Sequence, residues 1–423
     1  MDAKLRVPHR DQMEMRVESL ESMLTPDHPA RAIWEFTGQL DLSPWTSKIA
    51  SKQGAAGAPA LHPRVLVSLW MMATIDGVTS ARELSELTES HTAYRWLCGG
   101  EPINYHSLSD FRNSDPEQLE KLLVQSVAAL MHAGAATLQT VAQDGMRVRA
   151  NAGTRSFRRE ATLKQCLAAA EAQVAALKEP EPSDGVTPRK SAARERAARE
   201  RKERLEAAVA SMEQLQAENA ERFPSQRKDP SELRASTTDA EATKMKMGDG
   251  GYRPAYNVQF ATTVEGGVIV GVAVTSEGVD SSQMEPMIDK LESLYGQRPE
   301  KYLVDGGFVN QDAIDRVETS KTEVLAPVPR ATQKIAKGED PYARRPGDTD
   351  AVAKWRQRMA TVEAKEDYKK RSSTAEWANA QARNHGLSQF LVRGIRKVLS
   401  STFWYALAHN FQRLRARRAA MTG

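Results

Sequence analysis

The chain has 423 residues, which is enough for two or three domains that each have a hydrophobic core. Hydrophobic residues make up 40% and charged residues 27%, the balance of a soluble globular protein, and no apolar run approaches the ~20 residues that span a bilayer. Two distant cysteines and an N-terminal segment without the apolar core of a signal peptide favour a reducing cytoplasm over secretion.

The net charge of +4 is too small to indicate a nucleic-acid partner, but the charges are unevenly distributed. Residues 381–423 contain no Asp or Glu and carry a group of Arg and Lys side chains, namely Arg383, Arg393, Arg396, Lys397, Arg413, Arg415, Arg417 and Arg418. A basic segment of this kind attracts polyanions, although it can also simply be solvated.

Residues 1–135 are predicted to form a helical N-terminal domain. The apolar run PRVLVSLWMMATID (63–76) begins with a proline and predicts a buried helix, and Ser80 and Glu83 have the spacing of a capping box that begins the next helix. Short helices joined by tight glycine turns, with several Arg and His side chains, are typical of a helix-turn-helix DNA reader. A docking or dimerisation domain explains the same pattern equally well.

A strand is predicted for residues 138–143, and it ends in Asp144-Gly145. After this pair, apolar side chains alternate with Arg147 and Arg149, which gives the segment a basic outer face. These arginines either neutralise the carboxylate or hold a phosphate beside a metal-binding acid.

Residues 160–222 interrupt the strands with two predicted helices. Apolar residues recur every three or four positions from Leu163 to Leu177 and again from Leu205 to Leu215, which predicts an antiparallel helical hairpin with a coiled-coil seam. A Pro-rich loop joins the two helices. The stretch RERAARERKER is interpreted as a solvated helix surface, with nucleic-acid contact as the alternative.

Strands resume at residues 256–263 and 267–275, which flank a short turn. A helix follows, and the next strand, 302–305, delivers Asp305 to its C-terminal end. The Asp-Gly pair there fits ordinary turn chemistry, in which the carboxylate bonds its own backbone, but it also suits a metal ion or a phosphate. With a further helix and a strand at 324–328, the order is β, helical insert, β, β, α, β, α, β, before a helix-rich tail.

A third carboxylate, Glu376, is predicted at the start of a helix, three residues after Ser373, where it also fits a capping box. The three acids are 161 and 71 residues apart, so only the fold can bring Asp144 and Asp305 to Glu376. Arg383 follows seven residues later on nearly the same helix face, within reach of a phosphate held by the acids. Other acids compete for the third position, namely Glu363, Glu366 and Asp367.

With these residues in place, the sequence resembles the DDE transposases of bacterial insertion sequences, a family with a ribonuclease-H-like catalytic core. The resemblance extends over nearly the whole chain and rests on LHPRVLVSLWMMATIDGVTSARELSEL, YRWLCGG, NYHSLSDFR, QDGMRVRANAG, STTDAEATKMKMGDGGYRPAYNVQFAT, YLVDGGFVN, YKKRSSTAEWANAQARNHGL and LVRGIRKV. The family's Tyr–Arg–Glu–Lys signature corresponds to Tyr368, Arg371 and Glu376, with Arg383 where Lys is common. Met146 stands where many members have Thr.

The resemblance implies that Asp144, Asp305 and Glu376 are the catalytic acids and that they hold two Mg²⁺ ions, for which Mn²⁺ can substitute. Carboxylates are suitable ligands because hard cations prefer oxygen, and a metal pair can activate water and stabilise the leaving oxygen of a phosphodiester. Contacts to DNA are expected from Arg147, Arg149, Tyr368, Arg371 and Arg383.

The implied fold is α/β, with a ribonuclease-H-like mixed sheet built from residues 136–159 and 223–423. A helical domain (1–135) precedes this core, and the helical hairpin (160–222) is inserted after the first core strand. The expected partners are double-stranded DNA, both the inverted-repeat ends of the element and the target, and a second copy in a homodimer. The expected location is the bacterial cytoplasm at the nucleoid, without a membrane.

Two other functions compete with this prediction. The chain is either a transposase derivative that binds DNA without cutting it, or a structural protein that assembles through the hairpin. The presence of all three acids argues against the first alternative, and the Val- and Ile-rich strands argue against the second.

Overall fold

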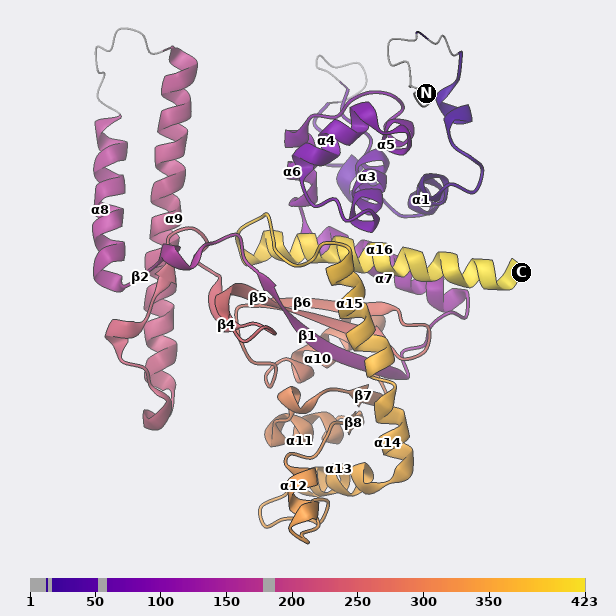
Figure 1. Cartoon of the computed structure of the whole chain (residues 1–423), viewed down its shortest axis with the longest axis vertical. Coiled ribbons are helices and arrows are strands. Elements are labelled where there is room, and N and C mark those ends of the chain that lie inside the picture. Colours follow the sequence, from indigo (N-terminus) through magenta and orange to yellow (C-terminus); the bar gives the residue numbers. More distant parts are fainter. Residues whose placement is uncertain (1–12, 14–16, 52–58, 178–186, 423) are drawn as a thin grey trace, which may run out of the picture.

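The computed structural model describes residue 13 and residues 17–51, 59–177 and 187–422 (Figure 1). Most of the N-terminal segment 1–16, which was judged not to be a signal peptide, lies outside these residues. The same holds for most of the predicted Pro-rich loop of the hairpin.

The N-terminal part of the described chain is helical, as predicted. After a short 3₁₀ turn (Leu20–Met23), its helices are α1 (Pro29–Thr37), α2 (Ser43–Thr46), α3 (Pro63–Ile75), α4 (Ala81–Ser90), α5 (Thr92–Leu97), α6 (Tyr105–Arg112) and α7 (Pro116–His132). Helix α3 begins at Pro63 and is almost wholly buried, because nearly every one of its side chains is apolar. The Ser80 side chain accepts a hydrogen bond from the Glu83 amide and caps α4.

The sheet is mixed and is organised around β1 (Thr140–Arg149). Strand β5 (Tyr252–Thr263) pairs antiparallel with β1, and β4 (Thr243–Lys246) and β6 (Ile269–Thr275) pair antiparallel with β5. On the other side of β1, β7 (Lys301–Leu303) is parallel to β1, and β8 (Glu323–Leu325) is parallel to β7. The predicted strands therefore occur in the predicted order along the chain, but β4 was not predicted.

Two helices make the crossovers that parallel strands require. Helix α10 (Met284–Tyr295) connects β6 to β7, and α11 (Gln311–Thr319) connects β7 to β8. The chain then forms α12 (Ala331–Ala336), α13 (Asp350–Ala360), α14 (Val362–Lys369) and α15 (Trp377–Asn384).

The helices α12 to α14 occupy a segment that shows no clear apolar period in the sequence. Trp355 of α13 is fully buried, but its neighbour Arg356 is buried as well, in an ion pair with Asp348. Because a charged residue shares the buried face of this helix, hydrophobic periodicity does not reveal it.

The long helix α16 (Ile395–Thr422) lies between the N-terminal helices and the sheet (Figure 1). Asn410 joins it to β6: its side chain accepts from the Ile269 amide at 2.9 Å and donates to the Ile269 carbonyl at 2.8 Å. The sequence predicts an amphipathic helix over residues 390–412, but Phe390 lies before α16 and not within it. The amide of Phe390 instead donates to the Arg149 carbonyl, which extends the pairing of β1, and the helix begins after Gly394, where φ is +86°.

The predicted helical hairpin is present as α8 (Glu160–Ala176) and α9 (Pro188–Glu221). It stands to one side of the sheet (Figure 1). At its base, β2 (Phe157–Arg158) pairs with β3 (Ala235–Ser236). Some of its buried residues form a cluster with β3 that is separate from the main core, consisting of Leu163, Ala208, Met212 and Ala235.

His409 makes the stability of this fold depend on pH. Its Nε2–H donates to the Gly267 carbonyl at 2.8 Å, and burial lowers the pKa of the imidazole to about 4, with the charges of Arg413 and His385 acting in the same direction. The unfolded chain, with a His pKa of about 6.5, therefore takes up the proton first, and stability falls as the pH drops from 6.5 toward 4.

Because the unfolded chain takes up a proton at His409 before the folded chain does, we expect the free energy of unfolding to be about 2 kcal/mol lower at pH 5 than at pH 7.5. The test compares the urea unfolding midpoints of the wild type and His409→Gln at these two pH values. The variant keeps a donor to Gly267 but cannot be protonated, so its midpoint should fall less. An equal fall in both proteins would contradict this assignment.

Candidate active site

The sequence predicted that Asp144 lies at the end of a strand. In the structure it lies in the middle of β1. The pairing of β1 with β5 continues without interruption from Val141 to Arg149. Gly145 therefore makes no turn. It makes room instead, because a Cβ atom there would lie 2.4 Å from both Asp280 Oδ1 and Gln259 Nε2.

The Asp144 carboxylate is held by α15 and by its own strand. Asn379 Nδ2 donates to Oδ2 at 2.9 Å, and the Gly145 amide donates to Oδ1 at 3.0 Å. Burial raises the pKa of the Asp144 carboxyl to about 6. The Arg371 guanidinium counteracts this shift, while the neighbouring Asp305 and Glu376 carboxylates add to it. Asp305 and Glu376 are therefore both close enough to influence Asp144.

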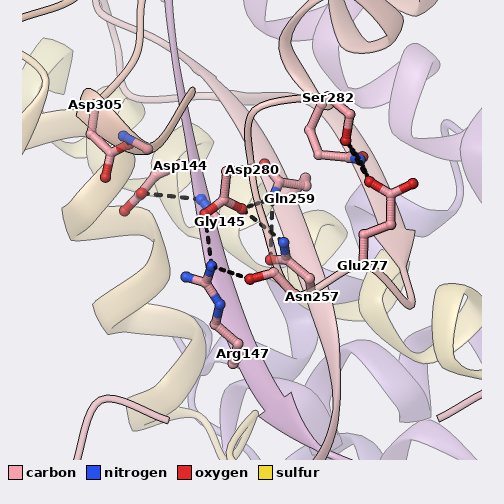
Figure 2. A network of polar contacts seen from close by, with 12 residues as sticks. Asp144, Gly145, Arg147, Asn257, Gln259, Glu277, Asp280, Ser282 and Asp305 are labelled. Carbon is pink, nitrogen blue, oxygen red and sulfur yellow. Dashed lines mark hydrogen bonds and ion pairs between the residues drawn. The ribbon is translucent and has the colours of Figure 1, made fainter. Parts of the chain in front are cut away.

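Asp305 lies two residues after the end of β7, and strand register explains its position. Ala142 of β1 pairs with Leu303 of the parallel strand β7, so Asp144 and Asp305 each lie about two residues beyond a matched pair. Figure 2 shows the two side chains next to each other. One carboxylate oxygen of Asp305 also accepts a hydrogen bond from the Gly307 amide at 2.7 Å. Turn chemistry and proximity to a second acid thus occur together here.

Glu376 is the last residue of a π-helical segment (Ser372–Glu376) and directly precedes α15, as the prediction of a helix start requires. The capping-box interpretation is wrong, because the Ser373 hydroxyl donates to the Lys370 carbonyl in the preceding turn. Glu376 forms an ion pair with Arg371, whose Nη1 is also 3.6 Å from Asp144 Oδ1. Arg371 thus lies between two of the acids. Single π turns inside α-helices occur frequently at functional sites.

The acids that competed with Glu376 in the sequence have other partners. Asp367 pairs with Lys301 and Lys370, and Glu366 pairs with Lys369. These carboxylates are neutralised by lysines, whereas the partner of Glu376 also faces Asp144.

The residues that were predicted to contact DNA are not all gathered at the acids. The Tyr368 ring lies 6.0 Å from the Arg371 guanidinium, and burial raises the pKa of its hydroxyl. Arg149 is exposed at the end of β1, and Arg383 is exposed in the last turn of α15. Arg147 lies on the opposite face of β1 from Asp144, because neighbouring residues of a strand alternate between faces.

Some residues of the site were not found from the sequence. Asp280, in the loop between β6 and α10, is buried beside Gly145, where Asn257 and Gln259 donate to it. Two polar side chains at alternate positions of an otherwise apolar strand were the available signal, since buried polar groups require partners. Asn379, which donates to Asp144, lies only three residues after Glu376.

The carboxylate oxygens at this site are suitable ligands for a divalent cation, but the side chains do not converge on a single point. Among the described residues, no three His, Cys, Asp or Glu side chains are placed to hold a metal ion as they stand. Arg371 takes up the space between Asp144 and Glu376. Two buried polar atoms beside it, Arg371 Nη1 and Asn379 Oδ1, lack hydrogen-bond partners. The amide oxygen of Asn379 and the buried Asp144 carboxylate can serve as ligands to a cation, whereas Arg371 Nη1 can donate only to an anion.

Two family models match the chain. A transposase domain (DUF772) matches residues 18–114, and a transposase DDE domain matches residues 336–415. The second match contains Tyr368, Arg371 and Glu376 and does not extend to Asp144 or Asp305. No curated protein and no solved structure matches the chain. Within the described residues, every helix is too short or too polar to cross a membrane.

Proposed function

Since the chain belongs to the DDE transposases of insertion sequences, we propose that it cuts the ends of its element and joins them to target DNA by metal-dependent hydrolysis and transesterification. The observation that carries this proposal is the meeting of three carboxylates from distant segments. Asp144 lies on β1, Asp305 lies just beyond the neighbouring strand β7, and Arg371 connects Asp144 to Glu376.

The topology of the sheet supports a ribonuclease-H-like core made of residues 136–159 and 223–423. Its first three long strands are antiparallel neighbours, and the last two are parallel to the first. The pairing of Arg158 with Ala235 brings the two ends of the insertion 160–222 together, as expected for an accessory hairpin. Residues 1–135 are proposed to bind DNA or to form the homodimer.

In the proposed mechanism, the carboxylates of Asp144, Asp305 and Glu376 would hold the two metal ions. When bound, two Mg²⁺ ions, or Mn²⁺ in their place, supply the Lewis acidity that activates the nucleophile and stabilises the leaving oxygen. Glu376 must first turn away from Arg371. The Arg371 guanidinium then binds the scissile phosphate, because a phosphodiester presents the same paired oxygens as a carboxylate.

DNA backbone contacts outside the centre are proposed for Arg149 and Arg383, which are exposed, and for Arg147 and Tyr368. Arg147 Nη2 donates hydrogen bonds to Asp280 and to the Gly278 carbonyl. Only the other nitrogens of its guanidinium are therefore available to contact DNA. The alternative function is a transposase derivative that binds DNA without cutting it.

A nicking assay distinguishes the two functions. The substrate is a duplex that carries the inverted repeats flanking the gene, incubated with the purified protein in Mg²⁺ or in EDTA. We expect strand breaks with free 3′-hydroxyl ends at the repeat in Mg²⁺ and none in EDTA. Binding without cleavage in Mg²⁺ and in Mn²⁺ would support the non-catalytic alternative.

A further inference from the structure

We propose that Asp280 is a positioning residue of the candidate active site, which fixes Asp144 and Asp305 relative to each other from the opposite face of β1. This inference rests on the proposed function, because it assigns a role in the same reaction. Neither the family signature nor the three acids predict it.

Asp280 is a buried carboxylate that accepts three side-chain hydrogen bonds. Its exposed fraction is 7%, and Oδ1 accepts from Asn257 Nδ2 and from Gln259 Nε2, both at 2.7 Å. Oδ2 accepts from Arg147 Nη2 at 2.9 Å. Figure 2 shows these donors converging on it from β1 and β5. Burying a charge is costly unless it is paired and hydrogen-bonded, and here it is both.

The same carboxylate lies against the backbone behind both acids. A Cβ atom at Gly145, the residue after Asp144, would lie 2.4 Å from Asp280 Oδ1. A Cβ atom at Gly307, whose amide holds Asp305, would lie 3.8 Å from Asp280 Oδ2. Asp280 therefore sets the spacing between β1 and the turn that follows β7.

A chain of hydrogen bonds extends this support into the strand that precedes Asp305. Gln143 Nε2 donates to Gln259 Oε1 at 2.8 Å, and the Tyr302 hydroxyl donates to Gln143 Oε1 at 2.8 Å. Tyr302 belongs to β7, so the network begins at Asp280, crosses β5 and β1, and ends in the strand that delivers Asp305. Buried networks of this kind hold a single arrangement when every member is satisfied.

The hydrogen bonds that Asp280 accepts indicate that it positions the site and does not ligate a metal ion. A carboxylate offers about four lone-pair sites, and three of those of Asp280 are already used by Asn257, Gln259 and Arg147. The Asp144 carboxylate accepts one side-chain hydrogen bond, from Asn379, and lies on the other face of β1, while that of Asp305 accepts from the Gly307 backbone amide. Asp280 consequently acts through them and not on the substrate.

The test uses Asp280→Asn together with the double variant Asp280→Asn, Arg147→Gln in the full-length protein. The single variant directs an amide NH₂ at the Arg147 guanidinium, so two donors face each other. In the double variant, the side-chain oxygen of the glutamine introduced by Arg147→Gln can accept from that NH₂, which restores the hydrogen bonds without restoring the charge. Asp348→Asn is the matched control, because it breaks another buried ion pair, with Arg356, in the segment before α13.

The measurements are the single-turnover cleavage rate at saturating DNA, the affinity for Mn²⁺ alone, and the melting temperature. We expect Asp280→Asn to cut about 10²-fold more slowly, as for a small misplacement of reacting groups, and to bind Mn²⁺ more weakly. The double variant should recover at least about tenfold in Mn²⁺ affinity, which is measured without DNA and does not involve the proposed DNA contact of Arg147. Asp348→Asn should melt at a lower temperature and retain both functions.

A rate and a Mn²⁺ affinity like those of the wild type in Asp280→Asn would overturn the proposal. So would equal losses of Mn²⁺ affinity in the DNA-free single and double variants, which would make Asp280 a ligand or a charge requirement. A wild type that binds Mn²⁺ without cutting DNA would refute the proposed function, and the Mn²⁺ affinities of the variants would still decide the role of Asp280.

Discussion

Asp305→Asn is expected to bind the ends of the element as tightly as the wild type and to cut them roughly 10³-fold more slowly or worse. The substitution keeps the shape of the side chain and an oxygen that can accept from the Gly307 amide, so the turn after β7 is preserved. It removes the negative charge that faces Asp144. Gel-shift titration measures binding, and single-turnover cleavage in Mg²⁺ measures chemistry.

The control for this variant is Asp312→Asn, an exposed acid in the first turn of α11, which should cut normally. Glu376→Gln and Glu366→Gln form a second matched pair, since both are helical acids that pair with a cation. Only the first should lose cleavage. Normal cleavage by Asp305→Asn would show that Asp305 does not belong to the site. Equal losses of cleavage in Glu376→Gln and Glu366→Gln would show that Glu376 has no special role.

Gly145→Ala should reduce both stability and cleavage, although it adds a single methyl group. The new Cβ would lie 2.4 Å from Asp280 Oδ1 and 2.4 Å from Gln259 Nε2, so β1 or the Asp280 loop must move. Overpacking of this kind typically costs 1–3 kcal/mol, or about 3–8 °C in melting temperature for a domain of moderate size. Because Asp144 is the adjacent residue, the displacement also moves a catalytic acid.

The matched control is Gly306→Ala, in the second Asp-Gly pair. There the new Cβ would meet Pro327 Cγ at 3.6 Å, an ordinary contact. Differential scanning fluorimetry and the nicking assay applied to both variants make the comparison. A melting temperature of Gly145→Ala equal to that of Gly306→Ala would show that the space behind Asp144 is not tight.

These two glycines also show what the sequence could predict and what it could not. Both follow an aspartate, and both were interpreted as turns that end a strand. The interpretation holds for Gly306, which begins a 3₁₀ turn after β7, and fails for Gly145, which remains inside β1. A local motif cannot distinguish the two cases, because the need for glycine at position 145 comes from Asp280, which is 135 residues away.

The strand order was predictable because apolar runs bounded by turn residues mark strands reliably. The π turn at Glu376 was not, because Ser373 and Glu376 have the spacing of a helix cap and nothing local excludes it. Asp280 was missed for a different reason. It occurs in a polar loop with no motif, and only the folded sheet brings Asn257 and Gln259 against it.

The most direct test of the account is whether the acids around Arg371 bind metal together. Mn²⁺ binding to the DNA-free protein can be measured by electron paramagnetic resonance for the wild type, Asp144→Asn, Asp305→Asn and Glu376→Gln, with Asp312→Asn as the control. We predict saturable binding by the wild type and the control, and an affinity at least about tenfold weaker in each of the other three variants. Affinity like that of the wild type in all three variants would contradict a shared metal site built from Asp144, Asp305 and Glu376.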